Sequence, residues 1–252
     1  MIGIFDSGSG GLTVLKEVRK LLPNADVVYF GDIANAPYGI KSQAELTKLT
    51  AQALSFLLER GVTTIVSACN SVASSVVMSL FDVFEFSPTH LIEMVGPTAS
   101  HFRGDKESQL LLCATPATLQ SGIYQEAFHM VGKEVVTVPI AELAGAIEFG
   151  RPKEEIEEVV SAALKEISSP YTHLILGCTH YPLVREIFQK IVGPEVEIVD
   201  PAVFVAKRVQ KQCGESEKGS GRTSFFISKE SPEFRAFVKG IVEDGSYTIE
   251  VI

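Results

Sequence analysis

A thiol, a hydroxyl and an imidazole follow an apolar run in the stretch Leu174-Ile175-Leu176-Gly177-Cys178-Thr179-His180-Tyr181-Pro182-Leu183. An apolar run that ends in polar side chains is typical of a buried strand whose carboxyl end leads into a loop. A second stretch has the same form, Ile65-Val66-Ser67-Ala68-Cys69-Asn70-Ser71. Its cysteine lies 109 positions before Cys178, which suggests that one structural unit occurs twice in the chain.

The same offset relates two further apolar runs. Asp6, which ends the first run of the chain, maps onto Thr115, which ends residues 110–114. Residues 27–28 map in the same way onto residues 136–137. Three consecutive apolar runs therefore repeat with no net insertion. We interpret this as two similar halves, each with a cysteine at the same place.

Short apolar runs alternate with amphipathic stretches along the chain. Strands are predicted over residues 2–5, 27–30, 63–68, 91–95, 109–114, 134–138, 173–177, 196–199, 224–227 and 247–252. Helices are predicted over residues 12–22, 43–59, 71–80, 115–131 and 153–167, after Pro182, and after the cap at Ser231-Pro232. Strands that alternate with helices of this length indicate βαβ units and parallel sheets covered on both faces.

The predicted fold is two similar doubly wound parallel-sheet domains related by internal duplication. We assign residues 93–204 to the second domain, and residues 1–92 together with 205–252 to the first. The tail joins the first domain because it follows a polar connector at 214–222 and lies outside the repeat. In a sheet with strand order 2-1-3-4, the loops after strands 1 and 3 meet where the order reverses. The active site is therefore expected in the cleft between the domains.

Composition excludes several classes of function. The 252-residue chain has a formal net charge of −9, which gives no electrostatic case for nucleic acid. No run of 18 apolar residues suggests a membrane span, and no basic, apolar leader precedes the first strand, so we expect a cytoplasmic protein. Its four cysteines are then expected to be reduced thiols. No cluster has metal-ligand spacing, and we expect no metal and no cofactor.

Two of the four cysteines are candidates for catalysis. Cys113 in mid-strand and Cys213 near a helix end are interpreted as small buried apolar residues. Cys69 and Cys178 each follow a strand and precede a helix N-terminus, where a thiolate is stabilised. Two opposed thiols suit stereoinversion of a carbon acid, because one thiolate removes a proton and the other thiol delivers a proton to the opposite face.

Other polar residues near these strand ends have a structural and a functional interpretation. His180 is either a satisfied buried imidazole or a group that tunes Cys178 or orients the substrate. Asp6 is either a helix cap or an aid to proton transfer at Cys69. The loop Gly8-Ser9-Gly10-Gly11 matches neither common phosphate-binding motif. Pro37-Tyr38-Gly39 is either a plain turn or a lip over the cleft.

Four motifs, in this order, resemble the glutamate racemase family over nearly the whole chain. They are Gly3-Ile4-Phe5-Asp6-Ser7-Gly8-Ser9-Gly10-Gly11-Leu12-Thr13-Val14, Ala34-Asn35-Ala36-Pro37-Tyr38-Gly39, Ala68-Cys69-Asn70 and Gly177-Cys178-Thr179-His180-Tyr181-Pro182-Leu183. The resemblance implies cofactor-independent interconversion of L- and D-glutamate, which supplies D-glutamate for peptidoglycan. The resemblance is also compatible with a homodimer.

The resemblance also implies roles for individual residues. It implies Cys69 and Cys178 as the two acid/base residues. Substrate contacts are implied at Asp6, Ser7, Tyr38, Gly39, Asn70, Ser71, Thr179 and His180. The family usually has Thr where this chain has Ser71, so a hydroxyl is kept and a methyl group is lost. The family's helper glutamate is matched to Glu148, with Glu142 as the alternative.

Two other functions stay open on the sequence alone. A racemase of this kind could act on aspartate or another acidic amino acid, because the sequence does not size the pocket. A two-lobed module that closes on an acidic solute is the alternative of a different class. The paired strand-end cysteines and the missing export signal argue against the solute-binding module.

Overall fold

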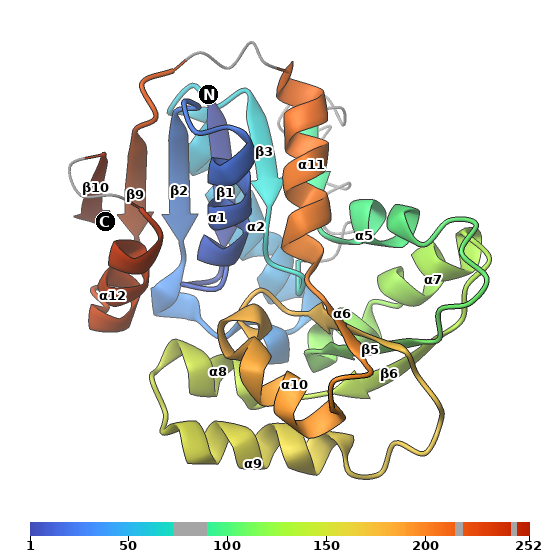
Figure 1. Cartoon of the computed structure of the whole chain (residues 1–252). Coiled ribbons are helices and arrows are strands. Elements are labelled where there is room, and N and C mark those ends of the chain that lie inside the picture. Colours follow the sequence, from blue (N-terminus) through green and yellow to red (C-terminus); the bar gives the residue numbers. More distant parts are fainter. Residues whose placement is uncertain (73–89, 215–218, 243–245) are drawn as a thin grey trace.

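Two separate parallel sheets organise the computed structural model, which describes residues 1–72, 90–214, 219–242 and 246–252. The first sheet, drawn in the upper part of Figure 1, contains β1 (Ile2–Asp6), β2 (Val27–Gly31), β3 (Thr64–Ser67), β4 (Leu91–Glu93), β9 (Thr223–Ile227) and β10 (Tyr247–Val251). The second contains β5 (Leu110–Ala114), β6 (Val135–Pro139), β7 (His173–Gly177) and β8 (Glu197–Val199).

Strand order in the two sheets confirms the predicted fold class. The first sheet runs β10-β9-β2-β1-β3-β4 and the second runs β6-β5-β7-β8, and every pair is parallel. When the strands are numbered within each half of the repeat, both sheets therefore contain the strand order 2-1-3-4. The order reverses between β1 and β3 in one sheet and between β5 and β7 in the other. Both cysteine-bearing loops leave the sheet at such a reversal.

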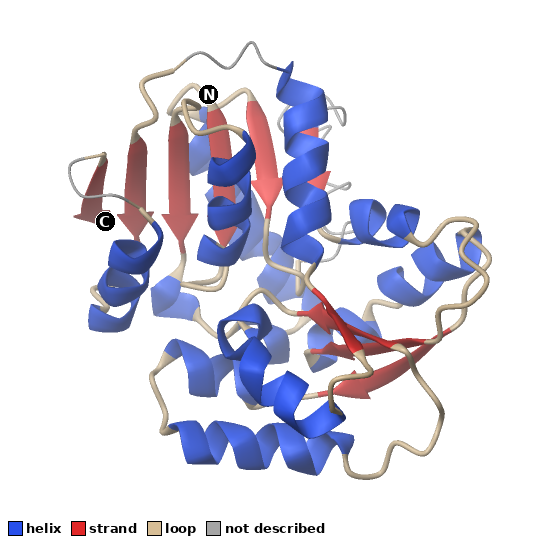
Figure 2. Ribbon diagram, viewed as in Figure 1, coloured by secondary structure: helices blue, strands red, loops and turns tan. Residues whose placement is uncertain are grey.

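Helices pack on both faces of each sheet. Figure 2 shows how the helices and strands are arranged. In the first domain they are α1 (Leu12–Leu21), α2 (Gln43–Leu58), α11 (Pro201–Cys213) and α12 (Pro232–Ile241). In the second they are α5 (Val95–His101), α6 (Pro116–Gln120), α7 (Ile123–Met130), α8 (Leu143–Glu148), α9 (Lys153–Leu164) and α10 (Arg185–Val192). Short 3₁₀ turns occupy Ile33–Asn35, Tyr38–Ile40 and Tyr181–Val184.

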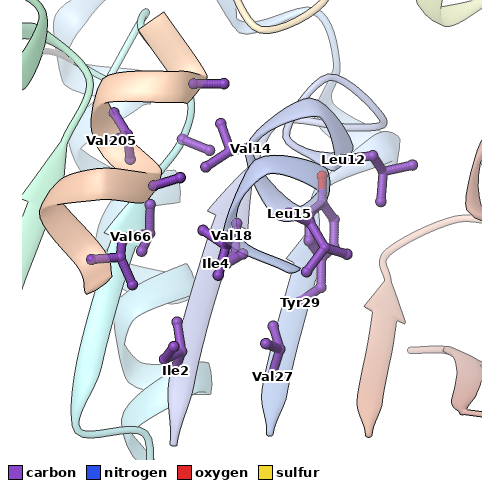
Figure 3. Close-up of a cluster of buried hydrophobic side chains, with 14 of the residues drawn as sticks. Ile2, Ile4, Leu12, Val14, Leu15, Val18, Val27, Tyr29, Val66 and Val205 are labelled. Carbon is purple, nitrogen blue, oxygen red and sulfur yellow. The ribbon is translucent and has the colours of Figure 1, made fainter. Parts of the chain in front are cut away.

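The largest core lies between the first sheet and helices α1, α11 and α12. Figure 3 shows Ile4 and Tyr29 of the sheet beneath Val14 and Val18 of α1, with Val205 of α11 beside them. All five side chains are fully buried. Burying a side chain of this kind stabilises a fold by about 1.5–3 kcal/mol. This packing fixes the amino end of α1, and with it the loop that follows β1.

The C-terminal tail returns to the first sheet, as predicted. Strand β9 pairs with β2, and β10 pairs with β9 at the sheet edge. Ser228, just after β9, donates to Asp32 Oδ1 at 2.7 Å and accepts from the backbone N–H of Ala34. The tail therefore holds the loop that leads to Tyr38. The exact domain boundaries, 1–92 with 205–252 and 93–204, stay a prediction.

Three predicted helices differ in the structure. The helix expected over residues 115–131 is two helices, α6 and α7, because Gly122 adopts a left-handed conformation with φ of 69° between them. The helix expected over 153–167 ends at Leu164. Pro182 lies in the 3₁₀ turn Tyr181–Val184, and α10 begins only after that turn, at Arg185. The helix predicted over 71–80 lies outside the described residues from position 73 onward, as does part of the connector at 214–222.

Candidate active site

Residues at the carboxyl ends of β1 and β3 form the first-domain side of the site. Asp6 ends β1 and is fully buried, and its Oδ2 accepts from the backbone N–H of Gly8 at 3.0 Å. The Cys69 thiol donates to Ser7 Oγ at 3.7 Å. The neighbouring strands of a doubly wound sheet therefore bring Asp6, Ser7 and Cys69 together, as the sequence predicted.

A thiol, an imidazole and a carboxylate form a line in the second domain. Cys178 Sγ lies 3.8 Å from His180 Nδ1, and His180 Nε2 lies 2.5 Å from Glu148 Oε2. Cys178 and His180 come from the loop after β7, and Glu148 is the last residue of α8. All three side chains are buried. Glu148 thus holds the imidazole at Nε2, while Nδ1 faces the Cys178 thiol.

Hydrogen bonds join the two sides of the site across the domain boundary. Thr179 Oγ1 donates to Asp6 Oδ1 at 3.0 Å. The backbone N–H and the hydroxyl of Ser9 both donate to Glu148 Oε2, at 2.8 and 2.7 Å. Ser71 Oγ lies 2.9 Å from Thr115 Oγ1. The loops of the two halves therefore interlock, and they leave Cys69 and Cys178 only 5% and 6% exposed.

Electrostatics differ between the two thiols. Burial, followed by the negative charge of Asp6, raises the pKa of the Cys69 thiol to about 12, and the charge of Cys178 adds to the rise. Beside Cys178, burial opposes the charging of His180, but the sulfur and the Glu148 carboxylate together raise the pKa of His180 well above its ordinary value. Burial also opposes the charging of Glu148, yet His180 and Ser9 lower the pKa of that carboxyl. The contact between the two side chains therefore favours the charged form of each, an imidazolium and a carboxylate.

Asp6 has a different environment from Glu148. Burial raises the pKa of Asp6, although the charge of His180 and the backbone N–H groups of Gly8 and Gly11 oppose the rise. Its carboxylate therefore takes up a proton more readily than an exposed aspartate does. A carboxyl with this property beside Cys69 is suited to receive a proton from the thiol.

The two candidate helper glutamates lie in different environments. Glu148 is 1% exposed and contacts His180 and Ser9. Glu142 is exposed at the start of α8. Glu148 therefore lies at the site beside His180, whereas Glu142 lies at the surface.

The lip at Tyr38 and Gly39 lies at the domain boundary. The Tyr38 hydroxyl donates to Asp32 Oδ2 at 2.6 Å, so this side chain holds its own loop. A Cβ atom at Gly39 would lie 2.6 Å from the side chain of Thr115 in the second domain. Any contact of Tyr38 with a ligand at the cysteines is therefore expected from its backbone.

Four polar residues of the site were absent from the predicted set: Ser9, Thr115, Thr118 and Tyr124. Thr118 Oγ1 lies 2.9 Å from Thr115 Oγ1 and extends the line of hydroxyls that begins at Ser71. Tyr124 donates to Asn70 Oδ1 at 2.6 Å. The offset of 109 pointed to Thr115 as the partner of Asp6, and Ser9 lies within the glycine-rich loop. No pattern in the sequence marks Thr118 or Tyr124.

Substituting Gly10 by alanine is expected to lower kcat/KM about 100-fold. An added Cβ would lie 2.5 Å from Thr179 Oγ1 and 2.6 Å from His180 Nδ1, so the two loops would have to separate. A shift of about 1 Å in catalytic groups can cost about 100-fold in rate. The matched control is Gly240→Ala in α12, where a Cβ meets nothing within 4 Å. Steady-state kinetics of both variants would contradict this account if the two were equally active.

Among the described residues, no group of three or more His, Cys, Asp or Glu side chains is arranged to hold a metal ion. None of the helices in the described part of the chain has the length and hydropathy of a membrane span.

Known proteins resemble this chain over nearly its full length. The family model described as Asp/Glu/Hydantoin racemase matches residues 10–209. A glutamate racemase of Aquifex aeolicus (strain VF5) is 35% identical over 242 residues, covering 96% of this chain and 93% of the relative. The Francisella tularensis glutamate racemase in complex with D-glutamate has a TM-score of 0.86 at 29% identity, covering 100% of this chain and 96% of that one. The glutamate racemase from Aquifex pyrophilus has a TM-score of 0.82 at 32% identity, covering 99% of this chain and 97% of that one.

The family-model match over residues 10–209, together with two parallel sheets of the same strand order, places the chain in the class of Asp/Glu/hydantoin racemases. Within this class, the 35% identity to the Aquifex aeolicus glutamate racemase over almost the whole chain indicates the particular family. The chain belongs to the glutamate racemase family, whose members are isomerases.

Proposed function

We propose that this protein interconverts L- and D-glutamate without a cofactor, with Cys69 and Cys178 as the two acid/base residues. The observation that carries the proposal is the placement of the two thiols. They are buried at equivalent strand ends of two domains, and the charge of one acts on the other. The family membership supports glutamate as the substrate, and the D-glutamate complex of the Francisella tularensis relative supports a site for it.

The protonation states of the site suit a reaction with two bases. Cys69, whose pKa is raised to about 12, rests as a thiol. The His180 imidazole, held by Glu148, faces the sulfur of Cys178 and is placed to assist proton transfer there. A thiolate at Cys178 takes the α-proton from one face of glutamate, and the thiol of Cys69 gives its proton to the other face. The reverse reaction starts from the opposite protonation state, which Asp6 beside Cys69 supports.

Hydroxyl and amide groups offer hydrogen bonds to the two carboxylates of glutamate. Ser71, Thr115 and Thr118 form a line of hydroxyls that begins two residues after Cys69. Asn70 has a buried amide nitrogen without a partner among the described residues. Unpaired buried donors stabilise a bound anion because the ligand supplies the missing acceptor.

Glutamate enters this site only after the domains separate. Both thiols are nearly closed off from solvent, and the bonds from Thr179 to Asp6 and from Ser9 to Glu148 cross the domain boundary. Breaking these few bonds opens the loops while each sheet keeps its own core. Closure then removes water from the α-carbon, which strengthens the electrostatic contacts at the thiols.

Circular dichroism of L-glutamate tests the proposal. Protein dialysed against a chelator, with no pyridoxal phosphate added, is expected to bring the signal of L-glutamate to zero. L-Aspartate, assayed in parallel, is expected to keep most of its signal over the same time. Binding of glutamate without loss of its signal would favour a solute-binding module instead. Loss of activity on chelation would contradict a metal-independent reaction.

The resemblance to glutamate racemases further supports a role in supplying D-glutamate for peptidoglycan, in the cytoplasm. A homodimer stays a prediction.

A further inference from the structure

The side-chain amide of Asn70 is satisfied at only one of its two ends. Asn70 directly follows Cys69 and is 4% exposed. Its Oδ1 accepts from the hydroxyl of Tyr124 at 2.6 Å, whereas its Nδ2 has no hydrogen-bond partner among the described residues. A buried donor without a partner destabilises the folded protein, because its lost hydration is not replaced. A donor of this kind beside Cys69 points to a group that a ligand satisfies.

Tyr124 reaches Asn70 from the other domain. It lies on α7, is fully buried, and its ring stacks on Phe128 with centroids 6.1 Å apart. Burial raises the pKa of Tyr124, so its hydroxyl keeps the proton that it donates. A separation of 2.6 Å matches O–H···O hydrogen bonds and is shorter than those usual for N–H···O. The contact therefore selects the orientation of the amide in which Oδ1 faces Tyr124.

We propose that Tyr124 is a positioning residue for the racemase, holding the Asn70 amide so that Nδ2 donates to a carboxylate of the substrate. The inference rests on the proposed function and adds a residue to it. An amide has nearly the same shape in both orientations, and the flipped one presents an acceptor that repels a carboxylate. Because Tyr124 and Asn70 belong to different domains, this orientation is fixed when the domains are closed.

Substituting Tyr124 by phenylalanine removes the hydroxyl and keeps the ring. The KM for glutamate is expected to rise about tenfold, the size of one lost hydrogen bond to a charged group, with kcat falling less than about threefold. In an Asn70→Ala background, the same substitution is expected to change KM less than about twofold. An equal effect in both backgrounds would overturn the proposal, because Tyr124 would then act on something other than Asn70.

Phe128→Leu is the matched control, since it disturbs the same buried packing of α7 without touching Asn70. It is expected to lower the melting temperature and leave KM within about twofold. A KM rise equal to that of Tyr124→Phe would show that loosened packing explains both, and it would overturn the proposal. Wild-type protein that fails to racemise glutamate overturns the proposed function and this inference with it. Active wild-type protein with an unchanged KM in Asn70→Ala overturns this inference alone.

A second measurement keeps the test independent of the folding of Tyr124→Phe. Protein labelled with ¹⁵N-asparagine shows the side-chain amide of Asn70 as the resonance pair that is lost in Asn70→Ala. On addition of glutamate to the wild type, the amide protons are expected to shift downfield, as they do when they donate to a carboxylate. An unchanged pair under saturating glutamate overturns the proposal.

Discussion

Alanine at either Cys69 or Cys178 is expected to reduce racemisation of glutamate by about 10³- to 10⁴-fold, in the upper part of the range of about 10²- to 10⁴-fold that a positioned acid or base contributes. Each thiol serves one face of the α-carbon, so the loss of one stops the reaction in both directions. The fold is expected to persist, because removing one small buried side chain costs about 1 kcal/mol or somewhat more. Circular dichroism of glutamate gives the rate, and thermal unfolding checks the fold.

The other two cysteines provide matched controls. Cys113 is fully buried in β5, and burial raises the pKa of its thiol to about 12. Cys213 is the last residue of α11, away from the site loops. Alanine at either position is expected to leave kcat/KM within about threefold while costing some stability. A well-folded but inactive Cys113→Ala protein would overturn the assignment of the catalytic pair.

Alanine at Glu148 is expected to have the second largest effect, on activity and stability together. It leaves the buried His180 without its carboxylate and takes the acceptor from the N–H and hydroxyl of Ser9. Removing one partner of a buried ion pair destabilises a protein by about 3–5 kcal/mol. With His180 no longer held beside the Cys178 sulfur, proton transfer at that thiol loses its support, and kcat is expected to fall about 100-fold or more. Denaturant unfolding and steady-state kinetics measure the two losses.

Glu142→Ala is the control for this prediction, because the same change is made at the exposed start of the same helix. It is expected to alter stability by less than about 0.5 kcal/mol. The stability gap between wild type and Glu148→Ala is expected to narrow in acid. Glu148 has a lowered pKa, so its stabilising contribution is lost as the pH falls through that value. Equal losses for the two variants would contradict the helper role of Glu148.

Much of the fold followed from periodicity and the repeat. The offset of 109 aligned Cys69 with Cys178 and correctly indicated two sheets of the same strand order. It could not show that Gly122 breaks the helix after Thr115, since an isolated glycine is also tolerated inside helices. Helix α8 was missed because six residues of Leu, Ala, Gly, Ile and Glu carry too little periodicity to be recognised.

The candidate site was predictable where residues follow strands directly. Asp6, Cys69 and Cys178 lie at strand ends, and the topology alone brings such positions together. Ser9 and Tyr124 are different, because each acts through a contact with the other domain. Those contacts form only when one domain packs on the other, and the spacing of residues within a single segment does not reveal that packing.

Deuterium incorporation in heavy water tests most directly whether two thiols serve opposite faces of one α-carbon. The thiol that delivers the proton exchanges with solvent before substrate binds, so D-glutamate formed from L-glutamate is expected to carry deuterium at the α-carbon. L-Glutamate recovered at low conversion is expected to keep its hydrogen, because a proton returned by the thiol that removed it is mostly the original one. Proton NMR of the two separated enantiomers measures both. D-Glutamate that largely keeps its α-hydrogen, or L-glutamate that gains deuterium as fast as D-glutamate forms, would contradict the two-thiol account.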